Sequence, residues 1–434
     1  MSLSIIVLAA GKGSRMLSSK PKVLHEVGNY PMLFHILDSI NSFNDAKVKV
    51  VISSSFSRFK SEIKSKYRKI TFSTQIKQNG TADAVTSSLD ESTKNSNTTL
   101  VLCGDTPLIS QKTLKKSLKK FHKDNLDLCV ISMIPDNITN SYGKLKFENK
   151  RLIGIVENSE ISNDKHSNIC NSGIMIFKTK RLIENLKLIK NKNKKKEYFL
   201  TDLVEIFKKK NLSIDHFSCD FTETLGVNCM KDLARVNAEF QRIKRNYYLS
   251  KGVQMVAPET IFFSYDTQIG KDVTIQPNVY FGLEVKIKDR VTLRSFSYLD
   301  NVIVSNDTVI GPYARIRDGV EIKENSRIGN FVEIKKSKVD KNVKISHLSY
   351  VGDSIINSDS NIGAGAITCN YDGFRKNKTI IGKNCFIGSN TSLVAPLNIK
   401  KGSVVGAGTV VNKDVPIETV VYRKSELIKK NKKK

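Results

Sequence analysis

The stretch IGPYARIRDGVEIKENSRIGNFVEI, residues 310–334, places an isoleucine at every sixth position. The same spacing of aliphatic residues extends, with brief interruptions, over residues 269–411, and valine or a small residue follows most of them four positions later. An α-helix repeats about every 3.6 residues and a strand every two, so neither explains the spacing. A hexapeptide repeat does explain it. The stretch therefore predicts short parallel strands stacked into a β-helix with its aliphatic side chains inside.

An all-β sandwich with evenly spaced strands is the alternative architecture. Its strands would alternate polar and apolar residues at every second position, and less regular turns would join them. A rod of stacked coils leaves its flanks and ends exposed, and such rods commonly need caps or partners. We therefore expect the chain to form an oligomer.

Length and composition limit the class of protein. A chain of 434 residues exceeds one typical core, which predicts two domains. It contains no apolar run long enough to cross a bilayer, and residues 1–10 are too short for a secretion signal, so we expect a cytoplasmic protein with no membrane partner. The seven cysteines form no CxxC pair, which disfavours structural zinc and disulfides and fits a reducing compartment.

The net charge of +29 raises the question of a nucleic-acid partner. Lysines, however, are spread along the whole chain and form dense runs only at residues 192–196 and 429–434. Tryptophan is absent, and aromatic residues do not alternate with basic ones as a base-stacking surface requires. We therefore expect no nucleic-acid partner, while anionic small substrates remain compatible with the charge.

The N-terminal stretch predicts a buried strand that ends in a phosphate-binding loop. The apolar residues 4–10 run directly into GKGSRM, residues 11–16. Its glycines allow backbone N–H groups to approach phosphates, and Lys12 and Arg15 add positive charge. The spacing is neither a Walker A motif nor a dinucleotide fingerprint, and a tight turn without a ligand is the alternative.

Strand-like segments near 48–52, 70–74 and 98–103 alternate with helix-like segments near 31–43, 58–66 and 81–89. This alternation predicts an α/β domain with a mostly parallel sheet between helices. Asp105 follows the last of these strands, where ligands bind in open α/β sheets. Its carboxylate suits Mg²⁺ held against phosphates, and a helix cap is the alternative. Apolar residues at helical spacing from Met230 to about Leu249 predict a linker helix.

Several motifs resemble the signature of the sugar-1-phosphate nucleotidylyltransferases. They are LAAGKGSRM (8–16), PKVLH (21–25), QIKQNGTA (75–82), LCGDTPL (102–108), YGKL (142–145), IVE (155–157), CNSGI (170–174), YFLTD (198–202) and GVN (226–228), in the family's order. The resemblance implies a Rossmann-like fold and one Mg²⁺ per site. It also implies that UTP or a UDP-sugar is bound by Leu8, Ala9, Ala10, Gly11, Lys22, Gln75, Gly80, Thr81, Cys103, Gly104, Asp105, Gly143, Glu157, Asn171 and Asn228.

Within that set the resemblance implies separate roles. Lys22 contacts the triphosphate, and Gln75 with Gly80 and Thr81 reads the uracil edge. The sugar is held by Gly143, Glu157 and Asn171, and the metal by Asp105 and Asn228.

The six-residue repeat lapses at three places. Its phase jumps by five residues between Ile334 and Val339 and between Val351 and Ile356, and residues 369–379 interrupt it. Because irregular segments tend to carry chemistry, we expect function there. The jumps bracket Lys335, Lys336, His347 and Tyr350, although a lone histidine in a β-rich domain is more often structural.

Three motifs near these lapses resemble the acetyltransferase half of the bacterial family of bifunctional N-acetylglucosamine-1-phosphate uridylyltransferases and glucosamine-1-phosphate acetyltransferases. They are HLSYVGD (347–353), NIGAG (361–365) and CNYDG (369–373). The resemblance implies a left-handed parallel β-helix, and a homotrimer that assembles this site between neighbouring rods. It implies synthesis of UDP-N-acetylglucosamine, a precursor of peptidoglycan and lipopolysaccharide, from glucosamine 1-phosphate, acetyl-CoA and UTP.

On this resemblance the chain divides into a nucleotidylyltransferase domain (1–227), a linker helix (228–250) and an acetyltransferase domain with a short basic tail (251–434). His347 is the expected base that takes the amine proton, with Glu333 as a candidate orienting neighbour. The expected sugar-phosphate contacts are Arg317, Lys335, Tyr350, Asn361 and Lys376. The expected acetyl-CoA contacts are Ala364, Asn370, Tyr371, Ser389, Ala407 and Arg423.

Two positions depart from the family's pattern. Asp318 stands where the family commonly has proline, beside Arg317, and Lys424-Ser425-Glu426 lacks the proline that usually follows the coenzyme arginine. Two other readings stay open. One is a nucleotidylyltransferase whose rod serves assembly only, and the other is a non-catalytic regulatory or nucleic-acid-binding protein, which only the charge favours.

Overall fold

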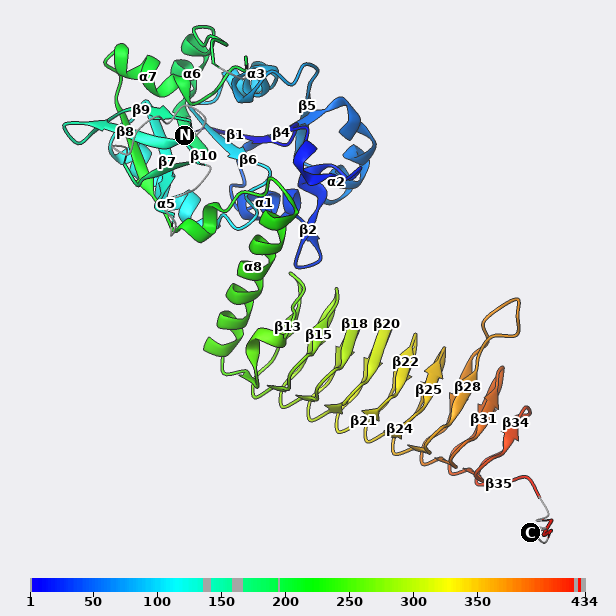
Figure 1. Cartoon of the computed structure of the whole chain (residues 1–434). Helices are drawn as coiled ribbons and strands as arrows, with labels where there is room; N and C mark the ends of the chain where they lie inside the picture. Colours follow the sequence, from blue (N-terminus) through cyan, green and yellow to red (C-terminus); the bar gives the residue numbers. More distant parts are fainter. Residues whose placement is uncertain (1, 136–141, 158–166, 194–195, 425–427, 431–434) are drawn as a thin grey trace. The chain divides into compact units, whose positions relative to one another are not determined.

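The computed structural model describes residues 2–135, 142–157, 167–193, 196–424 and 428–430. The chain forms two compact units, Met1–Phe240 and Gln241–Lys434, shown in Figure 1. Positions 194 and 195, the altered positions 425 and 426, and the end of the tail at 431–434 lie outside the described residues. No helix in the described ranges is both long enough and apolar enough to cross a membrane.

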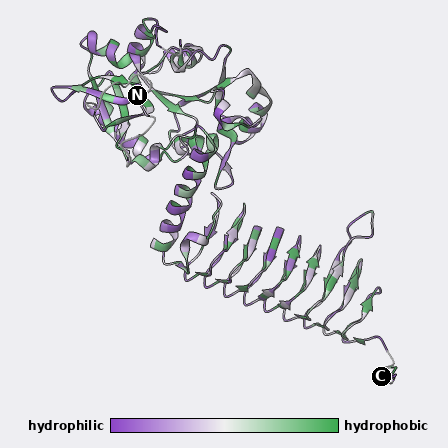
Figure 2. Cartoon of the chain, in the orientation of Figure 1, coloured by the Kyte–Doolittle hydropathy of each residue, from purple (hydrophilic) through white to green (hydrophobic). Residues whose placement is uncertain are grey.

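A sheet in the order β11-β7-β10-β6-β1-β4-β5 forms the centre of the first unit. The first four strands of this sheet in sequence order are parallel to one another, as predicted. They are β1 (Leu3–Leu8), β4 (Lys47–Ser53), β5 (Thr71–Gln75) and β6 (Thr98–Cys103). Ile5, Ile6 and Val7 are fully buried, because helices cover both faces of a strand in the middle of such a sheet. Figure 2 shows the hydrophobic colours on these central strands.

The rest of the sheet is mixed, which the alternation of segments did not indicate. β10 (Cys170–Lys178) lies antiparallel between β6 and β7 (Leu128–Met133), and β11 (Ile214–Ser218) adds to β7 in parallel. A hairpin of β8 (Lys144–Glu148) and β9 (Arg151–Val156) pairs with the start of β10. The register of β10 against β7 shifts between Asn171 and Met175, so the residues between these two positions bulge out of a ladder that is regular on either side.

Helices flank the sheet on both sides. One face of the sheet packs against α3 (Thr81–Ser87), α6 (Thr179–Leu186) and α7 (Asp202–Lys209), and Figure 1 shows α1 (Met32–Ile40) and α5 (Gln111–Lys123) on the other side. The remaining short elements of this unit are η1 (Ser14–Met16), η2 (Lys22–Leu24), β2 (Glu26–Val27), β3 (Tyr30–Pro31), η3 (Ser54–Phe59), α2 (Lys60–Lys66), α4 (Glu91–Lys94) and η5 (Phe221–Thr224). The helix expected from Met230 is α8 (Met230–Ser250), and the boundary between the units falls within it.

The second unit is a parallel β-helix, consistent with the left-handed form. One ladder contains β12 (Gln254–Met255), β14 (Thr274–Ile275), β17 (Thr292–Leu293), β19 (Val309–Ile310), β21 (Arg327–Asn330), β24 (Lys344–His347), β27 (Asn361–Ile362), β30 (Phe386–Ile387), β33 (Val404–Val405) and β35 (Val420–Val421). Neighbouring strands pair in parallel, and the repeat isoleucines and valines form one continuous core.

The other strands form a second, wider ladder that covers two sides of the coil. It contains β13 (Gln268–Ile269), β15 (Tyr280–Phe281), β16 (Val285–Ile287), β18 (Tyr298–Val304), β20 (Arg315–Ile322), β22 (Glu333–Lys335), β23 (Lys338–Val339), β25 (Tyr350–Gly352), β26 (Ser354–Ile356), β28 (Ile367–Cys369), β29 (Thr379–Ile381), β31 (Ser392–Val394), β32 (Leu397–Ile399) and β34 (Val410–Val411). A short helix, η6 (Pro258–Thr260), lies near the start.

The register explains the lapses of the repeat. Ile310 pairs with Ile328, and Ile328 with Ile345, so the second of these coils is one residue shorter than the first. Ile362 pairs with Ile387, because the insertion predicted at residues 369–379 adds a loop, residues 370–378, between β28 and β29. The lapses are therefore shortened corners and one insertion, and the stacking of the core continues through them.

Candidate active sites

A cavity of about 620 Å³ lies at the carboxyl ends of β1, β5 and β6, which end at Leu8, Gln75 and Cys103. This is the edge where open α/β sheets bind ligands. The predicted nucleotide-binding residues that line it are Leu8, Ala10, Gly11, Lys22, Gln75, Gly80, Thr81, Cys103, Asp105 and Asn228. Segments far apart in the sequence therefore meet at one hollow.

Each of the two predicted metal ligands accepts a hydrogen bond from a cationic side chain of this cavity. The Lys22 ammonium donates to the Asp105 carboxylate, and Arg15 Nη2 donates to Asn228 Oδ1 over 3.0 Å. The two predicted metal ligands thus offer one carboxylate and one amide oxygen to the same cavity. Mg²⁺ is commonly held by one or two such oxygens together with substrate phosphates and water, so this donor set fits it.

The loop after β5 forms another wall of the cavity. Gln75 Nε2 donates to Gly80 O over 3.0 Å and to Asp83 Oδ2 over 2.7 Å. Gly80 has φ +116°, and a Cβ there would come within 2.5 Å of Tyr198 O, so only glycine fits without a shift. Thr81 Oγ1 accepts from Leu200 N over 2.9 Å, which ties this loop to the segment before α7.

The end of β6 carries the Cys103 thiol and packs closely against the end of β1. Burial raises the pKa of the Cys103 thiol to about 12, with a further contribution from the Asp105 charge, so this thiol stays neutral. Gly104 N donates to Leu8 O over 2.9 Å, and a Cβ on Gly104 would lie 2.9 Å from that same oxygen. Gly104 and the buried Ala9 therefore set the close packing of two strand ends beside the cavity, whose lining includes neither of them.

The predicted sugar contacts form a separate group: Gly143 directly precedes β8, Glu157 directly follows β9, and Asn171 lies on β10. Asn171 N donates to Gly143 O over 2.8 Å, and Asn171 Oδ1 accepts from Gly173 N over 2.9 Å. Glu157 Oε1 accepts from Thr201 Oγ1 over 3.0 Å. These residues do not line the cavity, but the Cys103 thiol contacts Gly173 O over 3.4 Å and joins the two groups.

Sequence reasoning missed part of the cavity lining. Gln78 donates to Ala10 O, and Glu197 and Phe199 also line the cavity. Gln78 lies inside the quoted QIKQNGTA motif, and Glu197 and Phe199 flank Tyr198 of YFLTD. The motifs could therefore have indicated these three residues.

His347 ends β24 at a corner of the rod. Its Nδ1 lies 2.5 Å from Asn330 Oδ1, and the two residues are register partners on adjacent coils. An Nδ1–H that donates to this oxygen leaves the lone pair on Nε2, as a general base requires. A hollow of about 300 Å³ beside it is lined by His347, Asn330, Ser346, Gly329, Arg294 and Arg327, among others.

Glu333, the expected orienting neighbour of His347, is engaged elsewhere. Its Oε1 accepts from Arg317 Nε over 2.9 Å and from Arg317 Nη2 over 2.8 Å, and it also contacts Arg315. Among the described residues, Asn330 is the hydrogen-bond partner of the His347 ring, and the orienting role of Glu333 stays a prediction. Asn330 lies one coil away at the same register position, a relation visible only once the coil length is known.

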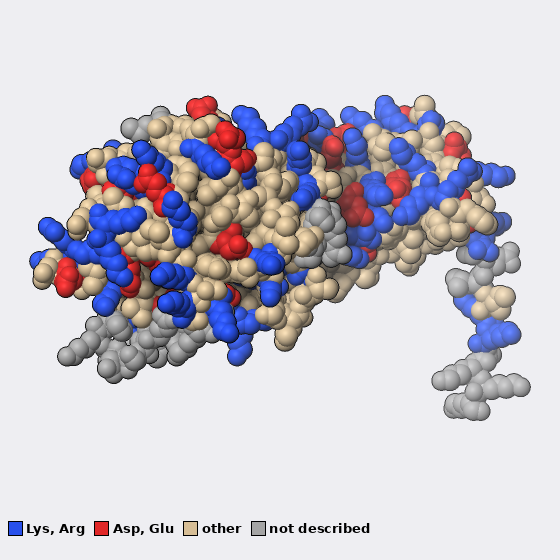
Figure 3. All heavy atoms as spheres, turned by 90° about the horizontal axis from the view of Figure 1, so that it is seen from above, with Lys and Arg blue, Asp and Glu red and all other residues tan. Residues whose placement is uncertain are grey.

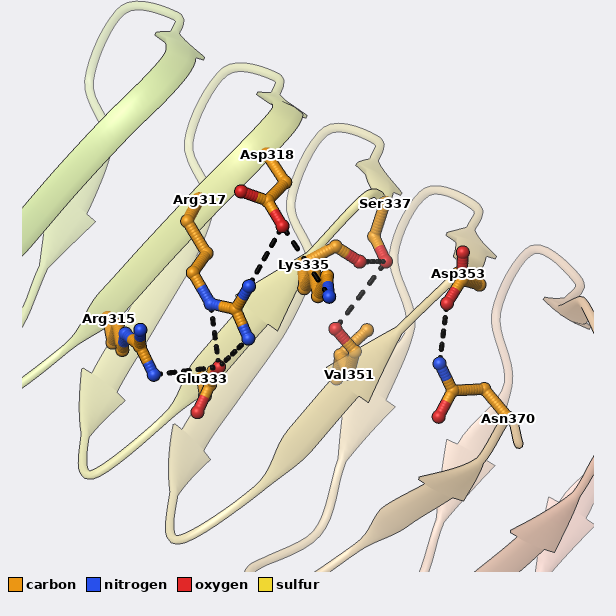
Figure 4. Close-up of polar contacts among 9 residues, drawn as sticks. All are labelled: Arg315, Arg317, Asp318, Glu333, Lys335, Ser337, Val351, Asp353 and Asn370. Carbon is orange, nitrogen blue, oxygen red and sulfur yellow. Dashed lines mark hydrogen bonds and ion pairs between the residues drawn. The ribbon is translucent and has the colours of Figure 1, made fainter. Parts of the chain in front are cut away.

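Arg317, Asp318, Glu333 and Lys335 form a group that we call the cation cluster (Figure 4). Arg317 Nη1 donates to Asp318 Oδ2 over 2.8 Å, and Lys335 Nζ lies 3.5 Å from the same oxygen. Lys376, on the loop 369–379, is close enough to Lys335 that this ammonium lowers its pKa. None of the five predicted sugar-phosphate residues is among those that line the hollow beside His347.

The predicted coenzyme contacts on the coils form a row with His347. Ala364, Ser389, Ala407 and Arg423 each follow by two residues a member of the paired series Ile362, Ile387, Val405 and Val421, as His347 follows Ile345. Before three of them stand Gly363, Gly388 and Gly406, where a Cβ would come within 2.7 Å of the next coil. Close stacking therefore excludes side chains at these three glycine positions.

The remaining coenzyme contacts lie at the insertion. Asn370 Nδ2 donates to Asp353 Oδ2 over 2.5 Å, and Tyr371 forms an isolated bridge with Lys376. Tyr371 is largely exposed. This loop is therefore anchored at its base and presents an aromatic ring to solvent.

Comparisons with known proteins agree with both units. Residues 4–221 match the family model of nucleotidyl transferases. Residues 298–395 match a model described as the GMPPB C-terminal domain, and residues 378–413 match the hexapeptide repeat of succinyl-transferase.

Curated relatives match almost the whole chain. Proteins named bifunctional protein GlmU are 39% identical in Bartonella quintana and 41% identical in Bartonella bacilliformis, each over 98% of this chain and 95% of the relative. The protein of that name in Wolbachia pipientis wMel is 38% identical over 98% of each chain. Both halves therefore align within single relatives.

Proposed function

The chain belongs to the GlmU family of bifunctional proteins, and we propose how its residues divide the two reactions of that family. The protein is a bifunctional enzyme that makes UDP-N-acetylglucosamine. One reaction transfers an acetyl group from acetyl-CoA to glucosamine 1-phosphate. The other transfers uridylyl from UTP to N-acetylglucosamine 1-phosphate and releases pyrophosphate. Alignment of both units within single relatives is the observation that carries this conclusion.

For uridylyl transfer, the Lys22–Asp105 ion pair and the Arg15–Asn228 hydrogen bond in the cavity support a role for Lys22 and Arg15 as phosphate contacts. On UTP binding, both cations would exchange Asp105 and Asn228 for phosphate oxygens, and so neutralise charge on the leaving pyrophosphate. Asp105 and Asn228 would then hold Mg²⁺, which supplies further charge neutralisation when bound. We assign uracil recognition to Gln75, Gly80 and Thr81.

The sugar of the uridylyl acceptor is assigned to Gly143, Glu157 and Asn171. Their group offers a backbone carbonyl, a carboxylate and an amide, which suit a hydroxylated, N-acetylated ring. The acceptor's phosphate oxygen attacks the α-phosphorus of UTP, and the bond to pyrophosphate breaks.

For acetyl transfer, His347 Nε2 takes a proton from the amine as the amine attacks the thioester carbonyl. Asn330 orients the ring through Nδ1. We assign the substrate's phosphate to Arg317, Lys335 and Lys376, and we assign further contacts with the sugar phosphate to Tyr350 and Asn361. Coenzyme A would lie along the row Ala364, Ser389, Ala407 and Arg423, next to Asn370 and Tyr371.

A homotrimer would complete this second site. The hollow beside His347 is lined by none of the assigned phosphate contacts, which supports their supply from a neighbouring chain. Light scattering of the purified chain should give the mass of a trimer, and a monomer with full acetyltransferase activity would contradict this arrangement.

We place the protein in the cytoplasm. Its seven cysteines, all described and all free thiols, fit that compartment.

Two readouts on one protein sample test the function. Wild type should release thiol from acetyl-CoA when given glucosamine 1-phosphate, and pyrophosphate when given UTP and N-acetylglucosamine 1-phosphate. Release of pyrophosphate without thiol would leave a nucleotidylyltransferase with a structural rod. Salt-sensitive oligonucleotide binding with neither product would favour the nucleic-acid reading, but Figure 3 shows Lys and Arg spread over the visible face among acidic residues.

A further inference from the structure

The guanidinium of Arg317 is held on two of its edges. Glu333 Oε1 accepts from Nε and Nη2, which fixes the plane of the group on the strand ladder. Asp318 Oδ2 accepts from the remaining Nη1 over 2.8 Å. Because Glu333 already sets the orientation of Arg317, Asp318 is not needed for that purpose.

Asp318 reaches a second cation as well. The same oxygen that accepts from Arg317 lies 3.5 Å from Lys335 Nζ. The side chains of Arg317 and Lys335 are only 21% and 16% exposed, against 35% for Asp318. A carboxylate on the more exposed side therefore faces two cations that are mostly shielded from water (Figure 4).

The backbone at Asp318 permits this placement. Asp318 has φ +60° and Gly319 φ +83°, a left-handed pair at the corner of the coil. Aspartate adopts this conformation more readily than most residues, and proline, locked near φ of about −65°, cannot adopt it. This conformation alone offers a simpler explanation for aspartate at this position: Asp318 suits a left-handed corner, and its ion pairs are incidental.

The cations around Asp318 favour a role in anion binding over a purely conformational one. A phosphate and a carboxylate are recognised by the same donors, and two adjacent cations on one carboxylate oxygen form a site of that kind. Without Asp318, Lys335 would repel Arg317, whose charge only Glu333 would then balance, and it would repel Lys376, whose pKa is lowered by its side-chain contact with Lys335 and by the charge of that ammonium. A built-in carboxylate relieves this repulsion before substrate arrives, and any phosphate that binds there must displace it.

We propose that Asp318 is a specificity-determining residue of the acetyltransferase site: within the cation cluster it is the internal counter-ion of Arg317 and Lys335, and the phosphate of the substrate displaces it. This inference rests on the proposed assignment of Arg317 and Lys335 to that phosphate. Asp318 thus weakens binding of the acceptor, and it favours a doubly charged phosphate over weaker anions that cannot displace a carboxylate.

Asp318→Asn is the sharpest test. Asparagine keeps the left-handed corner and the shape of the side chain but removes the charge. The KM for glucosamine 1-phosphate should fall about three- to tenfold, the range expected for loss of one competing, partly shielded ion pair. The KM for acetyl-CoA should be unchanged. Inorganic phosphate, used as a probe, should inhibit the variant at correspondingly lower concentration.

Asp307→Asn is a matched control. Asp307 is also a left-handed corner residue, with φ +59°, and its carboxylate makes two 2.7 Å hydrogen bonds to Arg290. This substitution removes the same charge and also breaks an arginine pair, but outside the cation cluster. Its KM for glucosamine 1-phosphate should equal that of wild type, so a fall in both variants would reflect net charge alone.

The proposal would be overturned if the KM for glucosamine 1-phosphate does not fall. An unchanged or higher KM in Asp318→Asn, and in Asp318→Gly as a second variant that accepts positive φ, would make Asp318 a structural or orienting residue. A purely structural role would lower the melting temperature without lowering KM. Arg317→Gln separates this failure from failure of the proposed function: if its KM equals that of wild type, the phosphate assignment itself is wrong.

Discussion

At the scale of single residues, His347 depends on a partner from the adjacent coil. We propose that Asn330 is a positioning residue for His347, because its oxygen lies 2.5 Å from Nδ1 and would favour the tautomer with a basic Nε2. Asn330→Ala should lower kcat for acetyl transfer about tenfold through misplacement of the ring, with little change in either KM.

A second substitution at this position separates orientation from bulk. Asn330→Asp should keep the contact and shift the acidic limb of the pH profile of kcat/KM to higher pH, because a carboxylate raises the pKa of a neighbouring imidazole. An unchanged kcat in Asn330→Ala, or a profile that does not move in Asn330→Asp, would show that the contact plays no part in the reaction.

Cys103 offers a prediction on pH. Its pKa is raised from 9.0 to about 12, so the native thiol stays protonated while an unfolded one ionises. Its contribution to stability is therefore complete below pH 9 and is lost as pH rises from 9 toward 12. At pH 8.5, native Cys103 should react with iodoacetamide about a hundredfold more slowly than free cysteine, as measured by peptide mass spectrometry. Rapid labelling would contradict the raised pKa, since Cys103 lines an open cavity.

Some residues of the candidate sites could be predicted from sequence motifs, whereas others became evident only from contacts between stacked coils. Lys22 and Asp105 stand in recognisable motifs, and the structure brings them together in the cavity. Asn330 belongs to no motif, and its contact with His347 arises only because these two coils stack with this register. Likewise, the departure at Asp318 was visible in the sequence, but the two ion pairs that it makes were not.

At the scale of elements, the side chain of Asp372 accepts three hydrogen bonds within the loop 370–378. Asp372 Oδ1 accepts from Phe374 N over 2.9 Å and Arg375 N over 2.8 Å, and Oδ2 accepts from Asn377 over 2.8 Å. These donors lower the pKa of Asp372 to about 2. Its share in holding the turn is therefore complete above pH 3.8 and is lost only as pH falls toward 2.

Asp372→Ala should loosen this loop, which carries Tyr371 and Lys376. The KM for acetyl-CoA should rise about three- to tenfold, with uridylyl transfer unaffected. Arg375→Gln is the control, because Arg375 donates to Asp372 through its backbone N–H, and its exposed side chain lies 3.7 Å from the carboxylate. Equal KM values for acetyl-CoA in wild type and Asp372→Ala would show that the turn does not position the coenzyme contacts.

Elements with a clear period could be predicted, and those defined by distant pairing could not. The six-residue spacing indicated the β-helix, and apolar runs indicated β1, β4, β5 and β6. The antiparallel place of β10 between β6 and β7 left no local signal, because pairing direction depends on where the chain returns to the sheet.

At the scale of the whole molecule, the chain joins two cores of different construction. The first unit buries apolar strands between helices, and the second buries aliphatic side chains inside its coils. The cavity with Asp105 belongs entirely to the first unit, and His347 with the cation cluster belongs to the second. Each reaction should therefore proceed without the other site, and N-acetylglucosamine 1-phosphate should pass from one site to the other through solution.

Mixing two inactivated variants tests this requirement most directly. Asp105→Ala should retain acetyl transfer but lose uridylyl transfer, and His347→Ala should show the reverse. Neither variant alone should make UDP-N-acetylglucosamine from glucosamine 1-phosphate, acetyl-CoA and UTP, whereas an equal mixture of the two purified proteins should make it after a lag. If the mixture makes none, or if either substitution abolishes both reactions, the chain does not carry two independent active sites.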